Sequence, residues 1–250
     1  MSPSQARVEL TIDVFEETGQ RALALSDLKP PQLVNAILQE FHNLEYLGDD
    51  ADAYNLLRAE SGEPLDAETS LDQQVKKGDR LVLAEQEQPL PAGTRRPSLA
   101  IYLREPHEAK TYAVQWLPAI IGRRSEHQPH DELVAVDLRA YESGLRVSRR
   151  HVRLTETRGD FYVENLSGNP ASLVSQRWTG PVAVTAQRQI LTPGDVIRLD
   201  RSGIELKFIV RPSAPAPALD VAEAAPAAEE APMQPEPAES AEQPKDPGSD

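Results

Sequence analysis

The sequence has no cysteine, few aromatic residues and no long apolar run. Without cysteine, the chain cannot form a disulfide framework, a cysteine nucleophile or a thiolate metal site. No apolar run approaches the roughly 18 residues of a membrane-spanning helix, and the N-terminus lacks the basic and apolar segments of a signal peptide. We therefore expect a soluble, cytoplasmic protein without membrane insertion. With four Phe and two Trp, its cores must consist mainly of Leu, Val and Ile.

The chain also lacks an excess of positive charge. Its net charge is -14, and only residues 97–211 are slightly basic, with 16 basic and 13 acidic side chains. Residues 1–96 carry 9 basic and 18 acidic side chains, and residues 212–250 carry 1 and 9. The small surplus in the middle block does not suit nucleic acid, which selects strongly basic surfaces, but it suits one localised anion.

Residues 1–85 show the pattern of a small α+β domain. Apolar alternation and turn signals predict four strands, and Pro30 and Pro31 can open a helix because the first helical turn needs no N–H donor. The predicted order is strand 8–14, strand 21–25, helix 30–41, strand 54–59, a short helical segment 70–75 and strand 80–84. This order resembles that of bacterial ubiquitin-like (β-grasp) domains. The resemblance implies a docking module for a further protein; conjugation is not expected, because the last strand continues into the chain without a free C-terminal diglycine.

Two segments have the composition of connecting or unstructured chain. Residues 86–97 contain three prolines and one glycine and are predicted to be a linker. Residues 212–250 contain nine prolines and eleven alanines. A segment with so few large apolar side chains cannot offset the entropy of ordering, so we predict a disordered acidic tail.

Residues 98–211 read as strands and turns with no helix between them, which predicts an all-β sandwich. The predicted strands are 100–103, 111–116, 119–121, 133–137, 151–155, 160–164, 181–184, 189–191, 195–199 and 204–210.

Four clusters of residues occur in this block, in the order Gly122-Arg123-Arg124, Ser148-Arg149-Arg150-His151, Asn165-Leu166-Ser167-Gly168-Asn169 and Pro193-Gly194-Asp195-Val196-Ile197. Together they resemble the forkhead-associated domain, a β-sandwich that binds phosphothreonine peptides. The resemblance covers about residues 98–210.

The resemblance implies a role for each cluster. A phosphate monoester carries nearly two negative charges and needs fixed donors, ideally a guanidinium. By resemblance, Arg123 and Ser148 contact the phosphate, Arg149 adds a main-chain or cationic contact, and Asn169 holds the peptide main chain beside Gly168. The residues implied as structural support are Gly122, His151 and Ser167.

One departure from the family pattern concerns the loop after Asn169. The family usually has glycine and a hydroxyl residue there, but this chain has Pro170 and Ala171, and Gly168 stands where threonine often lines the pocket. Proline fixes φ near −65° and so excludes a positive-φ turn. This predicts a wider pocket, weaker selectivity for threonine or a lost site.

These features predict a non-catalytic adaptor without a cofactor, which binds a threonine-phosphorylated partner, a kinase or its substrate. The alternative is a phosphate-independent structural component of a bacterial assembly such as a secretion system. An enzyme is not expected, since no nucleotide-binding glycine loop, helical histidine pair or nucleophile elbow occurs. A metal site at His127, His130 and Asp131 is a minor alternative, because loop histidines so close together are usually solvated.

Overall fold

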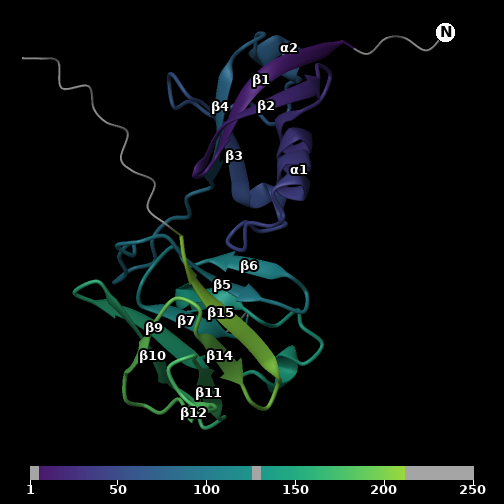
Figure 1. The fold of residues 1–250 in the computed structure, drawn as a ribbon. Coiled ribbons are helices and arrows are strands. Elements are labelled where there is room, and N and C mark those ends of the chain that lie inside the picture. Colours follow the sequence, from purple (N-terminus) through teal and green to yellow (C-terminus); the bar gives the residue numbers. More distant parts are fainter. Residues whose placement is uncertain (1–5, 126–130, 212–250) are drawn as a thin grey trace, which may run out of the picture. The chain divides into compact units, whose positions relative to one another are not determined.

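The computed structural model describes residues 6–125 and 131–211 (Figure 1). The predicted tail, residues 212–250, lies outside the described residues. Within the described residues, no helix is both long enough and apolar enough to cross a membrane.

The first part of the chain forms a four-stranded mixed sheet with one long helix. The strands have the order β2-β1-β4-β3, in which β1 and β4 are parallel and the other neighbours are antiparallel. The elements are β1 (Arg7–Val14), β2 (Glu17–Leu25), α1 (Pro30–Glu40), β3 (Tyr54–Arg58), α2 (Leu71–Gln74) and β4 (Arg80–Glu85). All six elements predicted from the sequence are confirmed, with ends that differ by a few residues.

Residues in the first turn explain why the long helix α1 begins at Pro30. Pro30 and Pro31 occupy its first turn, and the backbone N–H of Lys29 donates to Oε1 of Gln32 at 2.9 Å. Its buried side chains lie at helical spacing and pack with the inner face of the sheet in one core. These side chains are Leu33, Val34, Ile37 and Leu38.

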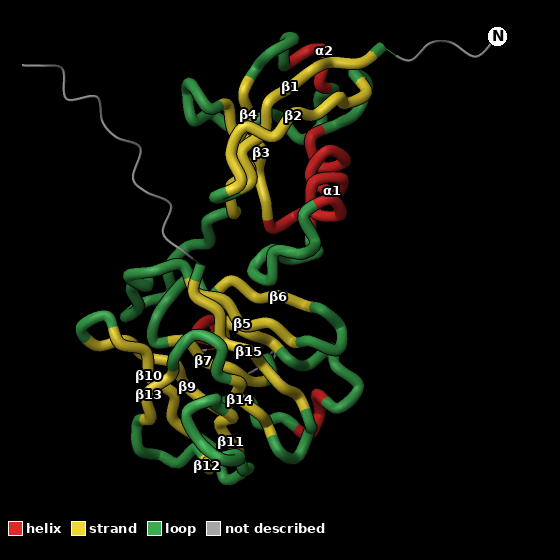
Figure 2. The backbone as a smooth tube through the Cα atoms, in the orientation of Figure 1, coloured by secondary structure: helices red, strands yellow, loops and turns green. Residues whose placement is uncertain are grey.

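The second part forms two sheets of short strands, with only single-turn helices between them (Figure 2). The five-stranded sheet has the order β13-β10-β9-β7-β8, and its strands are β7 (Ala119–Gly122), β8 (Val134–Asp137), β9 (Val152–Thr157), β10 (Asp160–Asn165) and β13 (Gln189–Leu191). The six-stranded sheet has the order β12-β11-β14-β15-β5-β6, and its strands are β5 (Ile101–Glu105), β6 (Lys110–Ala113), β11 (Ala171–Val174), β12 (Val182–Ala183), β14 (Val196–Leu199) and β15 (Ile204–Val210).

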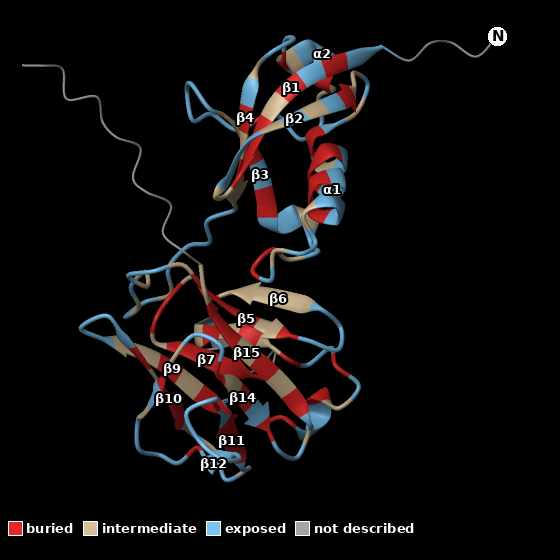
Figure 3. Ribbon diagram, in the orientation of Figure 1, coloured by how far each residue is buried: buried red, intermediate tan, exposed pale blue. Residues whose placement is uncertain are grey.

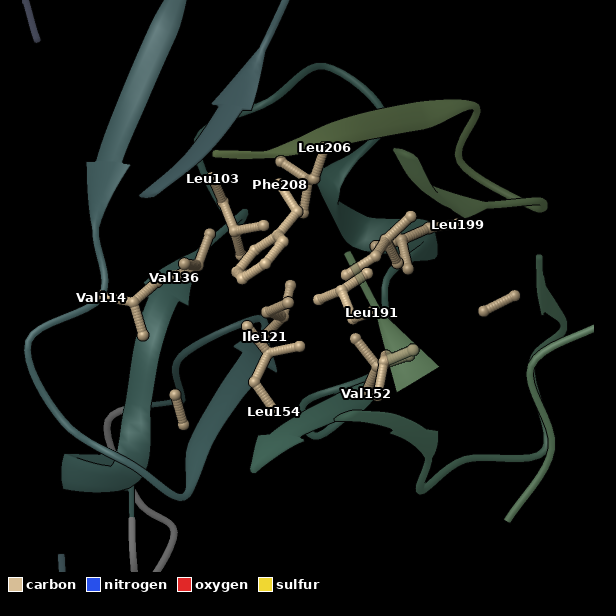
Figure 4. Close-up of a cluster of buried hydrophobic side chains, with 14 of the residues drawn as sticks. Leu103, Val114, Ile121, Val136, Val152, Leu154, Leu191, Leu199, Leu206 and Phe208 are labelled. Carbon is tan, nitrogen blue, oxygen red and sulfur yellow. The ribbon is translucent and has the colours of Figure 1, made fainter. Parts of the chain in front are cut away.

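The two sheets enclose one apolar core. Leu103 and Phe208 of the six-stranded sheet and Ile121 and Leu154 of the five-stranded sheet point toward one another (Figure 4). All four are buried, and buried segments alternate with more exposed ones along most of these strands (Figure 3). The predicted β-sandwich is therefore confirmed for this part of the chain.

The sequence prediction was wrong at two strands of the sandwich. It missed β11, which follows directly after Pro170, and it extended the strand at 111–116 beyond its true end at Ala113. Three of the four residues of β11 are buried, although Ala171 and Ser172 are not strong strand formers. Packing in the sandwich therefore determines this strand more than local propensity does.

The predicted linker ends in contact with the sandwich. Arg95 forms an isolated antiparallel bridge with Leu117, and its Nη1 lies 2.8 Å from Oε2 of Glu156. The last residues before the sandwich are thus held by backbone pairing and by an ion pair.

Candidate functional site

The loops that carry the sequence clusters leave one sheet at the same end. Ile121, just before the end of β7, is paired with Val152 at the start of β9. Asn165 at the end of β10 is paired with the same Val152. The segments after β7, before β9 and after β10 therefore start from adjacent positions.

Hydrogen bonds bring Arg123, Ser148 and Asn169 together. The backbone N–H of Arg123 donates to the carbonyl of Ser148 at 3.2 Å. Nδ2 of Asn169 donates to Oγ of Ser148 at 2.9 Å. Ser148 thus contacts the other two residues, and all three are partly exposed.

The hydrogen bonds of Asn169 determine which of its atoms face a ligand. Besides the bond to Ser148, Nδ2 donates to the carbonyl of Arg146 at 3.3 Å. A carbonyl only accepts, so the amide nitrogen must point toward it, and the side-chain oxygen Oδ1 of Asn169 is left as an acceptor for a ligand N–H. Because the Ser148 hydroxyl accepts from Asn169, its own hydrogen remains for donation to an anion.

Gly122 allows the first two loops to approach closely. A Cβ atom at this position would lie 2.1 Å from the carbonyl oxygen of Arg149 and 3.0 Å from that of Ser148. Real Cβ contacts are never this short, so only glycine permits the observed packing. The role expected for Gly122, structural support of the site, thus has a steric basis.

The arginines of the site differ in their partners. Nε of Arg123 donates to the carbonyl of Val147 at 3.4 Å, and within the described part of the chain no carboxylate pairs with Arg123 or with the exposed Arg149. Arg124 is exposed and donates from Nη2 to the carbonyl of Val134 at 2.9 Å. Among the described residues, the guanidinium groups of Arg123 and of Arg149, the residue after Ser148, thus have no acidic partner.

His151 lies beneath the loops. Its side chain is fully buried, its backbone N–H donates to Ile121 at 3.0 Å and its carbonyl accepts from Leu166 at 2.9 Å. Burial lowers the pKa of His151, while the carbonyls of Pro170 and Asn169 act in the opposite direction. The burial leaves this side chain no direct access to a ligand.

Asn165 holds the third loop and was missed as a site residue. Its Oδ1 accepts from the backbone N–H of Ser167 at 2.9 Å, and its Nδ2 donates to the carbonyl of Asn169 at 2.9 Å. Oγ of Ser167 accepts from the backbone N–H of Asn169 at 3.1 Å. Asparagine side chains often accept from the backbone N–H two residues further along, and this signal could have identified Asn165.

The loop after β10 does not contain the positive-φ turn that Pro170 excludes. No residue from 165 to 171, all of which the structure describes, has a positive φ. The carbonyl of Pro170 accepts from the backbone N–H of Asp200 at 3.2 Å, and the chain then enters β11. Gly168 is exposed, and a Cβ atom there would have no neighbour within 4 Å.

The metal alternative falls largely outside the described residues, since His127 and His130 both lie in the undescribed segment 126–130. In the described ranges, no group of three or more His, Asp or Glu residues could hold a metal ion.

A family model for the FHA domain matches residues 119–200. The matched segment begins with β7, ends just after β14 and includes all three loops. No curated protein matches the chain.

Several solved structures are similar to parts of this chain. The FHA domain of human APLF, in complex with an XRCC1 bisphospho peptide, is 20% identical to this chain and has a TM-score of 0.32. The match covers 44% of this chain and 97% of the APLF chain. A structure from a structural and functional analysis of phosphothreonine-dependent FHA domain interactions is 24% identical, with coverage of 45% and 98% and a TM-score of 0.33. Ubiquitin of Caldiarchaeum subterraneum is 15% identical, with coverage of 34% and 100% and a TM-score of 0.26.

Proposed function

We propose, on the premise that this chain contains a forkhead-associated (FHA) domain, that the protein is a non-catalytic adaptor for threonine-phosphorylated partner proteins. FHA domains are phosphopeptide-recognition modules. The observation that carries the proposal is that Ser148 bonds both Arg123 and Asn169, while Nε of Arg123 bonds the carbonyl of Val147, next to Ser148. A guanidinium with no acidic partner among the described residues, a hydroxyl and an amide therefore lie close together.

The donors and acceptors of the site match a phosphopeptide. A phosphate offers only acceptors at neutral pH, and Arg123, Ser148 and Arg149 offer charged or hydroxyl donors. The peptide main chain offers N–H groups, which the side-chain oxygen Oδ1 of Asn169 can accept. In this proposal Gly168 borders the bound peptide, and Gly122, His151 and Ser167 hold the loops in place.

Residues 1–85 are proposed to be a ubiquitin-like β-grasp domain that docks on a second protein. The support is the observed order β2-β1-β4-β3 with a parallel central pair β1 and β4 and the helix α1 after the first hairpin. In this proposal residues 86–97 are the linker, residues 98–211 the FHA domain and residues 212–250 a disordered tail, and the protein acts in the cytoplasm.

The phosphate site can be tested by removing one guanidinium. Hydrogen bonds to charged groups contribute about 1.5–3 kcal/mol, so Arg123→Ala is expected to weaken binding of a phosphothreonine peptide by about ten- to a hundredfold. The thermal midpoint should change little, because the Arg123 side chain makes one long hydrogen bond of 3.4 Å.

A matched control is Arg158→Ala. Arg158 is exposed in the turn between β9 and β10, at the opposite end of these strands from the loops. This variant removes the same charge and should bind as the wild type does. An unchanged affinity of Arg123→Ala would refute the assignment of the site.

A phosphate-independent structural component is the second candidate, and Pro170 is the observation that favours it. The residues after Asn169 depart from the family pattern, which weakens the analogy with phosphate-binding members. Treating a captured partner with phosphatase separates the two: adaptor binding is lost, whereas structural assembly persists.

A further inference from the structure

A second group of polar side chains lies on the outer face of the five-stranded sheet. Val152 and Leu154 of β9 belong to the core of the sandwich (Figure 4). Side chains alternate between the two faces of a strand, so Arg153, Thr155 and Thr157 lie on the face away from that core. None of these three residues belongs to the proposed phosphate site.

Arg153, Thr155 and Thr157 border a hollow of about 230 Å³. Pro118 and Arg188 also line it; the former directly precedes β7, and the latter directly precedes β13. The phosphate-site loop leaves the other end of β7, so the hollow lies toward the end of the sheet opposite the loops. Small-molecule sites usually measure about 300–1,000 Å³. The hollow therefore suits a single side chain of a partner.

Two arginines of the hollow converge on one buried carboxylate. Nε of Arg153 donates to Oε1 of Glu164 at 2.7 Å, and Nε of Arg188 lies 3.9 Å from the same oxygen. Glu164 is buried and is paired with Arg153 across β9 and β10. Within the described part of the chain, the Nη atoms of both arginines have no hydrogen-bond partner. Glu164 thus orients two guanidinium groups and leaves their outer nitrogen atoms available for a ligand.

The charges around the hollow do not balance. Arg95 also lines it, but its Nη1 lies 2.8 Å from Oε2 of Glu156 and its Nη2 donates to the carbonyl of Glu156 at 3.2 Å. Three arginines thus face two carboxylates, those of Glu156 and Glu164, which leaves one positive charge. One further carboxylate would neutralise this charge, and its two oxygen atoms match the planar donors of a guanidinium.

We propose that this hollow binds a carboxylate from an acidic peptide segment of a partner protein, supplied by a Glu or Asp side chain. Arg153 and Arg188 donate to it through their Nη atoms, and Leu117 and Pro118 form an apolar part of the wall. The site requires no phosphate, so the inference goes beyond the proposed function and does not depend on it.

The test titrates the full chain with fluorescently labelled hexaglutamate at low ionic strength, and with hexaglutamine as the uncharged probe. Hexaglutamate should bind and hexaglutamine should not. Arg188→Gln should weaken hexaglutamate binding by about two- to fivefold, the range for partly exposed ion pairs. Arg153→Lys should weaken it similarly, because lysine keeps the charge and can pair with Glu164 but lacks the outer planar donors.

Arg201→Gln is the matched control. Arg201 is exposed in the turn between β14 and β15, so this variant removes the same charge elsewhere and should bind hexaglutamate as the wild type does. Equal weakening in Arg201→Gln and Arg188→Gln, or unchanged binding in Arg153→Lys, would reduce the effect to net charge and overturn the inference. A wild-type chain that does not bind hexaglutamate would also overturn it.

Arg123→Ala separates the hollow from the phosphate site. This variant should bind hexaglutamate normally, whereas Arg188→Gln should bind a phosphothreonine peptide normally. Hexaglutamate binding that is lost in Arg123→Ala and kept in Arg188→Gln would place the acidic peptide at the phosphate site and contradict the inference. Failure of the wild-type chain to bind any phosphothreonine peptide would refute the proposed function alone.

Discussion

Adding a single methyl group at Gly122 is expected to separate the two loops that form the phosphate site. In Gly122→Ala the new Cβ would lie 2.1 Å from the carbonyl oxygen of Arg149, whereas real contacts of this kind are not shorter than 3.0 Å. The loop before β9 must therefore move by at least 0.9 Å, the difference between these two distances. A backbone carbonyl cannot rotate away as the end of a flexible side chain can, so the whole segment has to shift.

This shift is large enough to break the hydrogen bond between the loops. The N–H of Arg123 and the carbonyl of Ser148 are already 3.2 Å apart, and a separation about 0.9 Å greater leaves no hydrogen bond. Overpacking of this kind typically costs about 1–3 kcal/mol. We expect a free energy of unfolding lower by that amount and loss of phosphothreonine-peptide binding, measured by urea denaturation and by fluorescence anisotropy.

Gly168→Ala is the matched control in the adjacent loop. A Cβ atom at Gly168 would have no neighbour within 4 Å, and no positive φ is recorded there. The variant should unfold within about 0.5 kcal/mol of the wild type, as surface substitutions usually do. If Gly122→Ala were as stable as Gly168→Ala and bound the peptide as tightly as the wild type does, the steric reasoning would be wrong.

Two further predictions concern residues that support the site. Asn165→Ala removes the hydrogen bonds to Ser167 and Asn169, so peptide binding should weaken and the free energy of unfolding should fall by about 1–3 kcal/mol. The control is Asn35→Ala, at an exposed asparagine. Equal effects of the two variants in urea unfolding would contradict the supporting role of Asn165. For His151, burial lowers the pKa of the folded state, so below the unfolded value of about 6.5 the unfolded chain binds more protons and the free energy of unfolding falls as the pH is lowered. The decrease between pH 7.5 and 5.5 should be smaller in His151→Asn than in the wild type, and an identical decrease would exclude His151 as its source.

Much of the fold follows from local sequence signals. The helix α1 begins at Pro30, as the proline pair predicts. The strand β1, which alternating apolar residues predict, pairs with β2 on one side and with β4 on the other. The strand β11 could not be predicted in this way, because Ala171 and Ser172 give no strand pattern. Its burial depends on pairing with β12 and with β14, and β14 follows only after β12 and β13 in the sequence.

The principal residues of the candidate site and the supporting positions Gly122, His151 and Ser167 were predicted by resemblance, but the contacts that these positions make were not. Arg123, Ser148 and Asn169 are recognisable from the order of the clusters. The hydrogen bond from Asn165 to Asn169 spans 2.9 Å, and a Cβ atom at Gly122 would come within 2.1 Å of the carbonyl oxygen of Arg149. Such distances arise only when three loops meet, and a linear pattern does not contain them.

Phosphate dependence is the central claim, and one paired measurement tests it most directly. The full chain is titrated with a library of peptides, each made with phosphothreonine and with unmodified threonine. Some phosphorylated peptides should bind at least about ten times more tightly than their unmodified counterparts, since charge-assisted hydrogen bonds exist only with the phosphate. Equal binding of the two members of every pair would contradict the proposed function.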